Sequence, residues 1–267
     1  MVLRIALVGA TGRMGRLVEA IAAEADDLEV VRRIGSRDDL AGLADGDVVV
    51  DFTLPHISPK VVRAAAAAKR PVLVGTSGWT ADRVAALKGG LPSGAPGVLI
   101  VPNFSVGSVL ATAFAEQAAR WFDSMEIVEA HHAGKADSPS GTAVRTAERM
   151  AAARVDLGPV AAPHVDQRAR GQQVGSIPIH SLRLQGVVAA QDVLLGGPGE
   201  VLTIRHETTA PTAYRQGIRM ALDALPRTRG VVVGLEHLLF GGRPDAPTTG
   251  PAIVDRPSGQ AATVTGA

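Results

Sequence analysis

One short stretch of the chain, residues 129–143, holds most of the side chains that can do acid–base chemistry, and it reads EAHHAGKADSPSGTA. His131 and Lys135 can donate a proton or hold a negative charge, the two roles that catalysis on an anionic substrate requires. The glycines and the proline of the stretch predict a loop, so these side chains must converge through the loop and not along one helical face. We therefore expect proton donors beside a bound anion.

A helix is expected to begin where this loop ends. From Thr142 to about Arg154 the chain is rich in Ala, Arg and Glu, the residues that lose least on entering a helix. The first N–H groups of a helix have no internal partner, and with the hydroxyls of Ser140 and Thr142 they form a site for a substrate carboxylate. The segment taken alone favours a simpler alternative, in which Ser140 or Thr142 only caps the helix. The neighbouring histidines and lysine favour the anion site.

The histidine pair also has simpler interpretations. Two histidines taken by themselves are more often packed or surface residues than catalytic ones. A metal site is the weakest alternative, because the chain has no cysteine and no HExxH sequence, and Lys135 would repel a cation. We predict no metal.

Composition narrows the class of protein. The 267 residues, 46% of them hydrophobic, suffice for one large domain or two modest ones with a sizeable core. Zero cysteine excludes disulfides and thiol chemistry, and a formal charge of +1 with 3% aromatic residues gives no support for nucleic-acid binding. No apolar run is long enough to cross a membrane and no leader segment is evident. We expect a soluble, cytoplasmic protein with no nucleic-acid partner and no membrane partner.

The chain opens with a predicted strand, a glycine turn and a helix. Residues 3–8 are apolar, Gly9 permits the turn, the region of Gly12 lets the backbone approach a pyrophosphate, and Gly15 lets helix and strand lie close together. The spacing is GxxGxxG, with Thr11 where the middle glycine of GxGxxG would stand. Many α/β proteins have such turns, and it is the position at the first strand–helix junction that favours dinucleotide binding.

The end of the second predicted strand, residues 28–34, bears on the choice of cofactor. In a dinucleotide-binding fold an acidic residue at this strand end binds the 2′-hydroxyl of NAD. Here Ser36 and Arg37 follow, and an arginine beside a small hydroxyl suits the 2′-phosphate of NADP. The alternative is an arginine in a solvated turn, and the aspartates at 38 and 39 leave NADH open. We predict NADPH, NADH or both as cofactor.

Strands and helices alternate along the first part of the chain. Strands are predicted at 47–52, 71–74 and 97–101, and helices at 61–69 and 81–88. This alternation predicts a parallel sheet whose strands all end at one edge. GATGRMG, DFT, GTSG and VPNFS follow the strands and therefore line that edge, where ligands bind.

The pattern changes after residue 105. We predict a helix over 106–122, a strand over 125–130 that leads into the histidine loop, and an exposed loop over 155–175. Strands at 177–184, 187–195 and 201–207 are joined by short turns, which favours antiparallel pairing. A helix over 212–225 follows, and residues 231–240 complete the first domain.

The predicted fold class is α/β, with a Rossmann-type dinucleotide-binding domain and a second α+β domain whose sheet is mixed or antiparallel. The first domain takes residues 1–105 and 212–240. Residues 106–211 form the substrate-binding and oligomerisation domain. Residues 241–267, rich in Gly, Pro, Thr and Ala without periodicity, are predicted to be a disordered tail.

The chain resembles the dihydrodipicolinate reductases, also called 4-hydroxy-tetrahydrodipicolinate reductases, of bacterial lysine and diaminopimelate biosynthesis. The resemblance covers about residues 3–240 and rests on GATGRMG, DFT, GTSGW, VPNFSVG and above all EAHHAGKADSPSGTA, in this order. It implies a homotetramer in which the C-terminal segment completes the dinucleotide domain.

The resemblance also implies a reaction and a set of site residues. A reduced nicotinamide delivers hydride to a cyclic, unsaturated imine dicarboxylate. His131 and Lys135 match the family's proton donors, and the substrate contacts are His132, Ser140, Gly141 and Thr142. The residues expected at the cofactor are Gly9, Ala10, Thr11, Gly12, Arg13, Met14, Ser36, Arg37, Gly75, Thr76, Ser77, Val101, Pro102, Asn103 and Phe104.

Three positions depart from the family's pattern: Gly134, Ser138 and Pro211 stand where many members have histidine, alanine and arginine. They leave open a homologous reductase of a different cyclic imine carboxylate. A non-catalytic protein that senses NADPH is a further alternative, which the intact histidine and SGT segments disfavour. A short-chain dehydrogenase is excluded, because the single tyrosine, Tyr214, is not followed by the lysine of a Tyr-x-x-x-Lys pair.

Overall fold

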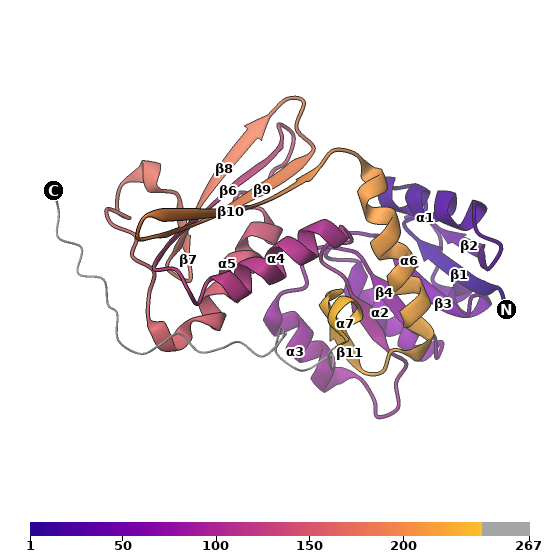
Figure 1. The fold of residues 1–267 in the computed structure, drawn as a ribbon. Coiled ribbons are helices and arrows are strands. Elements are labelled where there is room, and N and C mark those ends of the chain that lie inside the picture. Colours follow the sequence, from indigo (N-terminus) through magenta and orange to yellow (C-terminus); the bar gives the residue numbers. More distant parts are fainter. Residues whose placement is uncertain (242–267) are drawn as a thin grey trace. The chain divides into compact units, whose positions relative to one another are not determined.

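The computed structural model describes residues 1–241, and the tail predicted from residue 241 onward lies outside them except for its first residue. The described chain forms two compact units, one of residues 1–110 and 208–241 and one of residues 111–207. Figure 1 follows their elements along the chain. The boundary between the units after residue 110 falls within the helix Val106–Ala118. The sequence predicted boundaries beside residues 105 and 212.

The first unit contains a six-stranded sheet with the order β11-β5-β4-β3-β1-β2. Every neighbouring pair is parallel, because a helical connection returns the chain to the same end of the sheet. The predicted fold class is confirmed for this unit. The strands are β1 (Leu3–Val8), β2 (Leu28–Ile34), β3 (Val48–Asp51), β4 (Val72–Val74), β5 (Val98–Ile100) and β11 (Val231–Val233).

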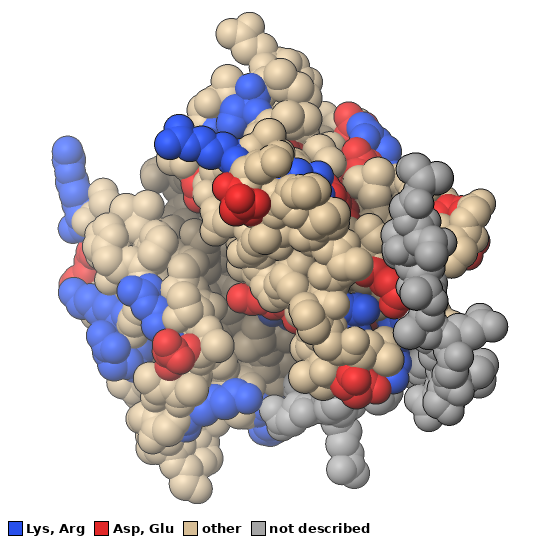
Figure 2. All heavy atoms as spheres, turned by 90° about the vertical axis from the view of Figure 1, so that its left-hand side faces the viewer, with Lys and Arg blue, Asp and Glu red and all other residues tan. Residues whose placement is uncertain are grey.

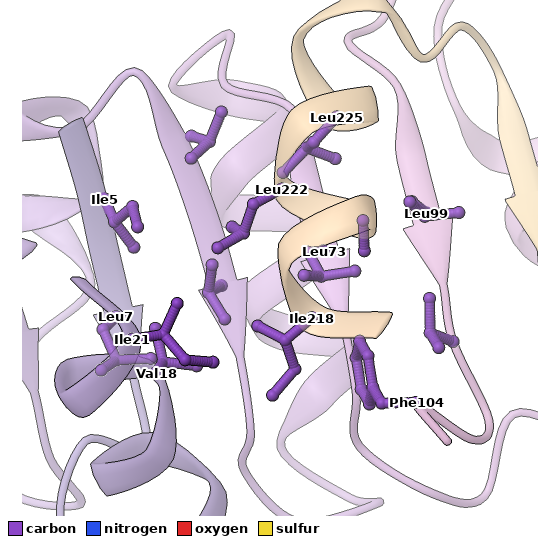
Figure 3. Close-up of a cluster of buried hydrophobic side chains, with 14 of the residues drawn as sticks. Ile5, Leu7, Val18, Ile21, Leu73, Leu99, Phe104, Ile218, Leu222 and Leu225 are labelled. Atoms are coloured by element: carbon purple, nitrogen blue, oxygen red, sulfur yellow. The ribbon is translucent and has the colours of Figure 1, made fainter. Parts of the chain in front are cut away.

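Helices cover both faces of this sheet. On one face lie α1 (Arg13–Ala23) and α6 (Arg215–Ala224), and on the other lie α2 (Ser58–Ala67) and α3 (Ala81–Gly90). Ile218 and Leu222, four positions apart on α6, are both fully buried, and Figure 3 shows them among the strand side chains. Removing one such side chain from water contributes about 1.5–3 kcal/mol.

Gly9 ends β1 in a conformation that suits only glycine. Its φ is +85°, and a Cβ added there would lie 2.4 Å from the carbonyl oxygen of Phe52. A Cβ on Gly15 would lie 2.3 Å from the carbonyl oxygen of Gly9. The predicted reasons for these two glycines, a tight turn and a close approach of helix to strand, are confirmed.

The second unit contains a five-stranded mixed sheet with the order β10-β9-β6-β8-β7. The central strand β6 is parallel to β8 and antiparallel to β9. The expected antiparallel pairing of successive strands is therefore wrong for β8 and β9, because the apolar strand β6 lies between them and pairs with both. The strands are β6 (Ser124–His132), β7 (Gln172–Val174), β8 (Ile177–Leu184), β9 (Ala189–Gly197) and β10 (Glu200–Thr208).

Two helices cover one face of this sheet, α4 (Val106–Ala118) and α5 (Gly141–Ala153). Met150 of α5 packs with the buried side chains of Ile127 and Ile179, which are register partners on β6 and β8. Two predicted boundaries change here. The helix expected to reach residue 122 ends at Ala118, and the loop expected over 155–175 includes β7, which pairs with β8 at the sheet edge.

Shorter helical elements complete the described chain. The single helix predicted over 212–225 is divided, because a proline stands near the start of each flanking 3₁₀ turn. These elements are η1 (Ala41–Asp45), η2 (Val155–Leu157), η3 (Arg168–Arg170), η4 (Pro211–Tyr214), η5 (Leu225–Arg227) and α7 (Glu236–Phe240).

The surface carries mixed charge on the face shown in Figure 2, where acidic side chains lie next to basic ones with wide uncharged areas between them. Within residues 1–241, every helix is too short or too polar to cross a membrane.

Candidate active site

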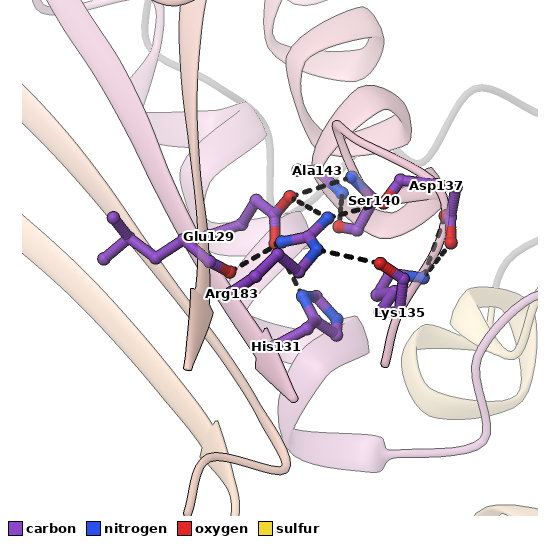
Figure 4. Close-up of polar contacts among 8 residues, drawn as sticks. Glu129, His131, Lys135, Asp137, Ser140, Ala143 and Arg183 are labelled. Atoms are coloured by element: carbon purple, nitrogen blue, oxygen red, sulfur yellow. Dashed lines mark hydrogen bonds and ion pairs between the residues drawn. The ribbon is translucent and has the colours of Figure 1, made fainter. Parts of the chain in front are cut away.

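The second unit gathers its acid–base residues at the end of β6. Side chains alternate between the two faces of a strand, so Glu129 and His131 lie on the same face of β6. The register pairs His131 with Arg183 of β8, which brings the arginine to that face as well. The chain then turns and enters α5, which covers this face. Figure 4 shows Glu129, His131, Arg183 and Ser140 directed toward one another.

The Glu129 carboxylate is the centre of the cluster. Its side chain is 0% exposed, and it accepts hydrogen bonds from Arg183 Nη1 and Nη2 at 2.9 and 3.0 Å and from the Ser140 backbone N–H at 3.1 Å. The His131 Nδ1 atom lies 2.6 Å from its other side. Burial acts to raise the pKa of Glu129, but the hydrogen bonds from Arg183, Ser181 and His131 outweigh it and lower the pKa. The carboxylate is therefore ionised.

His131 is held in one tautomer by this carboxylate. Because an ionised carboxylate can only accept, Nδ1 carries the hydrogen, and Nε2 is the nitrogen left for chemistry. Burial lowers the pKa of His131, and the charges of Lys135 and Arg183 lower it further, while Glu129 acts in the opposite direction.

The two histidines lie on the strand, which corrects the expectation that both belong to the loop. β6 continues to His132 because its pairing with β8 extends that far, where His132 lies opposite Leu184. Successive residues of a strand point to opposite faces, so His132 is directed away from the face of His131. The structure therefore joins His131 to the Glu129 cluster and leaves the exposed His132 outside it.

Lys135 lies in the turn that follows β6. Its backbone N–H donates to the His132 carbonyl at 3.0 Å, and its ammonium donates to both carboxylate oxygens of Asp137, at 2.6 and 2.8 Å. Burial acts to raise the pKa of Asp137, but the contact with Lys135 outweighs it and lowers the pKa. Asp137 lies within residues 129–143, but the sequence analysis did not predict that it pairs with Lys135.

Ser140 caps α5, as one of its two predicted roles requires, and its part in binding a substrate stays a prediction. It is almost fully buried, and its Oγ accepts a hydrogen bond from the Ala143 backbone N–H at 3.2 Å. The helix begins at Gly141, one residue earlier than predicted, and Gly141 is exposed. Thr142, the next residue, is half-buried.

Arg183 was missed by the sequence prediction. The one local signal that it gives is an arginine between two leucines of a strand, since a largely buried charge needs a partner. That partner, Glu129, stands 54 positions earlier, and only the register of β6 and β8 brings the two together.

In the first unit, the residues predicted at the cofactor follow the carboxyl ends of the strands. Residues 9–12 join β1 to α1, and residues 13 and 14 are the first two of that helix. The N-terminus of α1 has no side-chain cap and no acidic residue in its first turn, an arrangement that suits a phosphate. Ser36 and Arg37 follow β2 in an exposed turn, where Asp38 accepts a hydrogen bond from the Gly35 backbone N–H at 2.8 Å. Residues 75–77 follow β4 and residues 101–104 follow β5.

A second buried carboxylate, Asp51, orders this edge. It accepts hydrogen bonds from the Thr53 backbone N–H at 2.9 Å, from the Thr53 hydroxyl at 2.6 Å and from the Thr76 hydroxyl at 3.2 Å. Its other oxygen contacts the Ser58 hydroxyl, which also accepts from the Trp79 indole. Asp51 thus ties together the segments that follow β3 and β4.

Comparison with known proteins identifies the family. Residues 3–104 match the family described as "Dihydrodipicolinate reductase, N-terminus", and residues 107–239 match "Dihydrodipicolinate reductase, C-terminus". The chain belongs to the dihydrodipicolinate reductase family.

Named members of this reductase family are similar over nearly their whole length. The 4-hydroxy-tetrahydrodipicolinate reductase of Clavibacter sepedonicus is 57% identical over 98% of this chain and 99% of its own, and that of Streptomyces griseus is 43% identical over 89% and 98%. A solved structure, the dipicolinate-bound dihydrodipicolinate reductase of Paenisporosarcina sp. TG-14, superposes with a TM-score of 0.72 at 27% identity and covers 89% of this chain and all of its own.

Within residues 1–241, the structure has no group of three or more His, Cys, Asp or Glu side chains arranged to hold a metal ion. A dinucleotide is the cofactor that the glycine turn, the open N-terminus of α1 and the parallel sheet suit.

We predict that His131 of this reductase titrates below the ordinary histidine pKa of 6.5 and is protonated on Nδ1 when neutral. Two-dimensional NMR of the imidazole nitrogens across a pH series measures both properties. Because the pKa is lower in the folded than in the unfolded chain, the stability that it contributes is present above pH 6.5 and is lost as the pH falls through the folded pKa. His131→Gln should remove that part of the acid dependence of Tm. A pKa above 6.5 would contradict the arrangement.

Proposed function

We propose that this protein is a 4-hydroxy-tetrahydrodipicolinate reductase, which reduces its cyclic dicarboxylate substrate to tetrahydrodipicolinate in diaminopimelate and lysine biosynthesis. The observation that carries the proposal is His131 held by the buried Glu129, with Lys135 in the turn that follows the same strand, in a chain 57% identical to a named reductase. In this proposal residues 1–105 and 212–240 bind the cofactor, and residues 106–211 bind the substrate.

The reduction needs a hydride and a proton. A bound reduced nicotinamide supplies the hydride, and His131 and Lys135 are the groups that supply the proton. Protonated His131 donates from Nε2, and the neighbouring Glu129 carboxylate stabilises the imidazolium from the Nδ1 side. The Lys135 ammonium is the second proton donor, and it gives up its contact with Asp137 when it contacts the substrate.

The start of α5 is the proposed site for a substrate carboxylate. Gly141 and Thr142 lie in the first turn of the helix, where backbone N–H groups and the helix dipole favour an anion. Ser140 contributes by capping this turn, and His132 is the remaining proposed substrate contact. A carboxylate here would stand near both proton donors, since Lys135 lies in the turn that leads to this helix.

The cofactor is proposed to lie along the carboxyl edge of the six-stranded sheet. Residues 9–14 hold the pyrophosphate, residues 75–77 and 101–104 border the nicotinamide half, and Ser36 with Arg37 reaches the adenosine ribose. Asp38 directs its carboxylate to the Gly35 backbone N–H, which leaves the turn open to a 2′-phosphate. We propose that both NADPH and NADH are used.

We further propose a cytoplasmic homotetramer that assembles through the sheet of the second unit. Leu182 and Leu184 of β8 are 44% and 48% exposed. Ile179 packs among the residues of α5. Leu182 and Leu184 lie three and five positions further along the strand, so their side chains point to the opposite face of the sheet. Such an apolar face suits sheet-to-sheet assembly.

The reaction is tested by supplying freshly generated substrate with NADPH or NADH and following the nicotinamide absorbance. We expect rapid oxidation that falls by about 10²- to 10⁴-fold in His131→Gln and in Lys135→Ala, because each loses a proton donor. Both variants should keep their cofactor Kd and, above pH 6.5, their Tm. Cofactor binding without any turnover by the unaltered protein would favour a sensor or a reductase of a different cyclic imine carboxylate.

The cofactor turn is tested with Arg37→Ala. The KM for NADPH should rise up to about tenfold while the KM for NADH stays the same, since an exposed arginine makes a solvent-screened contact with the extra phosphate. The matched control is Arg33→Ala on the preceding strand, whose guanidinium contacts Glu19 at 2.5 Å. Equal effects of Arg37→Ala on both cofactors would reject the role of Arg37.

The assembly is tested by sedimentation equilibrium of Leu182→Asp, which places a charge on the proposed interface. We expect the unaltered chain to sediment as a tetramer and the variant as a smaller species of unchanged secondary structure. Val155→Asp is the control, because Val155 is 81% exposed and lies outside the sheet. A variant that remains tetrameric would place the interface elsewhere.

A further inference from the structure

The ion pair of Glu129 and Arg183 connects the elements of the second unit on which the proposed proton transfer depends. Glu129 contacts His131 of the same strand, Arg183 of the neighbouring strand and the backbone of Ser140 at the start of α5. An ionised carboxylate without access to solvent is stable only where donors surround it, so these contacts fix the position of each donor.

Arg183 extends the connection to the lysine loop. Nε donates to the Lys135 carbonyl at 3.3 Å, and Nη2 donates to the Asp137 carbonyl at 2.5 Å as well as to Glu129. Nη1 donates to Glu129 and, at 2.7 Å, to the Leu182 carbonyl. All five N–H groups of the guanidinium are therefore used, and two of them hold the backbone on either side of the loop's middle residue.

We propose that Glu129 and Arg183 are positioning residues, which set the places of His131, Lys135 and the start of α5 relative to one another. The proposal rests on the proposed function for its kinetic consequences. Neither residue needs to touch the substrate. Proton donors work only when they lie within a fraction of an ångström of the productive geometry, so loosening the pair lowers turnover more than binding.

The shape of the guanidinium distinguishes positioning from charge alone. A lysine at position 183 would keep the positive charge, but its single ammonium could not donate to the carboxylate and to both loop carbonyls at once. Arg183→Lys should therefore keep the ion pair in part and lose the loop contacts, so that it resembles Arg183→Ala in kcat.

The experiment measures kcat, KM, cofactor Kd and Tm for Arg183→Ala, Arg183→Lys and Glu129→Gln in the full-length protein. We expect kcat to fall by about 10²-fold in each, with cofactor Kd unchanged. Added guanidinium ion, at concentrations too low to denature the protein, should restore part of the kcat of Arg183→Ala and none of that of Arg183→Lys, whose side chain fills the space.

The matched control is Arg149→Ala. Arg149 of α5 pairs with Glu116 of α4, and the two side chains are 14% and 18% exposed, so this pair is also largely buried and belongs to the same unit. Its loss should lower Tm without the fall in kcat. An equal fall in kcat for Arg149→Ala, or unchanged kcat in a folded Arg183→Lys, would overturn the proposal. If Arg183→Ala does not fold, the kcat values of Arg183→Lys and Glu129→Gln decide whether the proposal holds.

The pKa of His131, measured by NMR, separates failure of this proposal from failure of the proposed function. Arg183→Ala removes a positive charge and should raise the pKa of His131. Glu129→Gln removes a negative charge and should lower that pKa, and Arg149→Ala should leave it unchanged. If the unaltered protein does not reduce the substrate, the proposed function fails, and the direction of these shifts still decides whether the pair holds His131. Shifts absent from both variants would reject it.

Discussion

A carboxylate that is fully removed from water must find hydrogen-bond donors on every side, and Glu129 imposes this constraint on the second unit. The donors come from β6, β8 and the start of α5, so the strand order, the register and the first residue of the helix all have to agree. Burial without these donors would neutralise the group or unfold the unit. This chain meets the constraint with Arg183, whose donors are all engaged.

The two units build their ligand sites by different means. In the first, the predicted cofactor residues lie in segments that follow the strands, and Asp51 fixes the segments after β3 and β4 from within. In the second, charged side chains from separate elements form the proposed site. A dinucleotide offers phosphates that backbone N–H groups can bind, whereas proton transfer needs titratable groups at defined atoms.

Much of the first unit was predictable because its information is local. Apolar runs, glycine turns and alternating helices predicted the parallel sheet. The differences are boundaries that moved by a few residues and the predicted helix over 212–225, which is divided. The second unit was less predictable, because β6 enters between β8 and β9 and no short-range pattern specifies that insertion. For the same reason Arg183 was missed, since its partner is distant in sequence, and the two histidines were assigned to the loop instead of the strand end.

Because His131 and His132 are adjacent, the proposed catalytic activity depends on the register of β6, as the stability of the sheet does. A slip of one residue would exchange their faces, move Glu129 away from Arg183 and turn Glu126 toward the helices. A chain with this shifted register would keep the fold of its first unit, but it would not catalyse the reduction. Correct insertion of β6 between β8 and β9 is therefore necessary for activity as well as for stability.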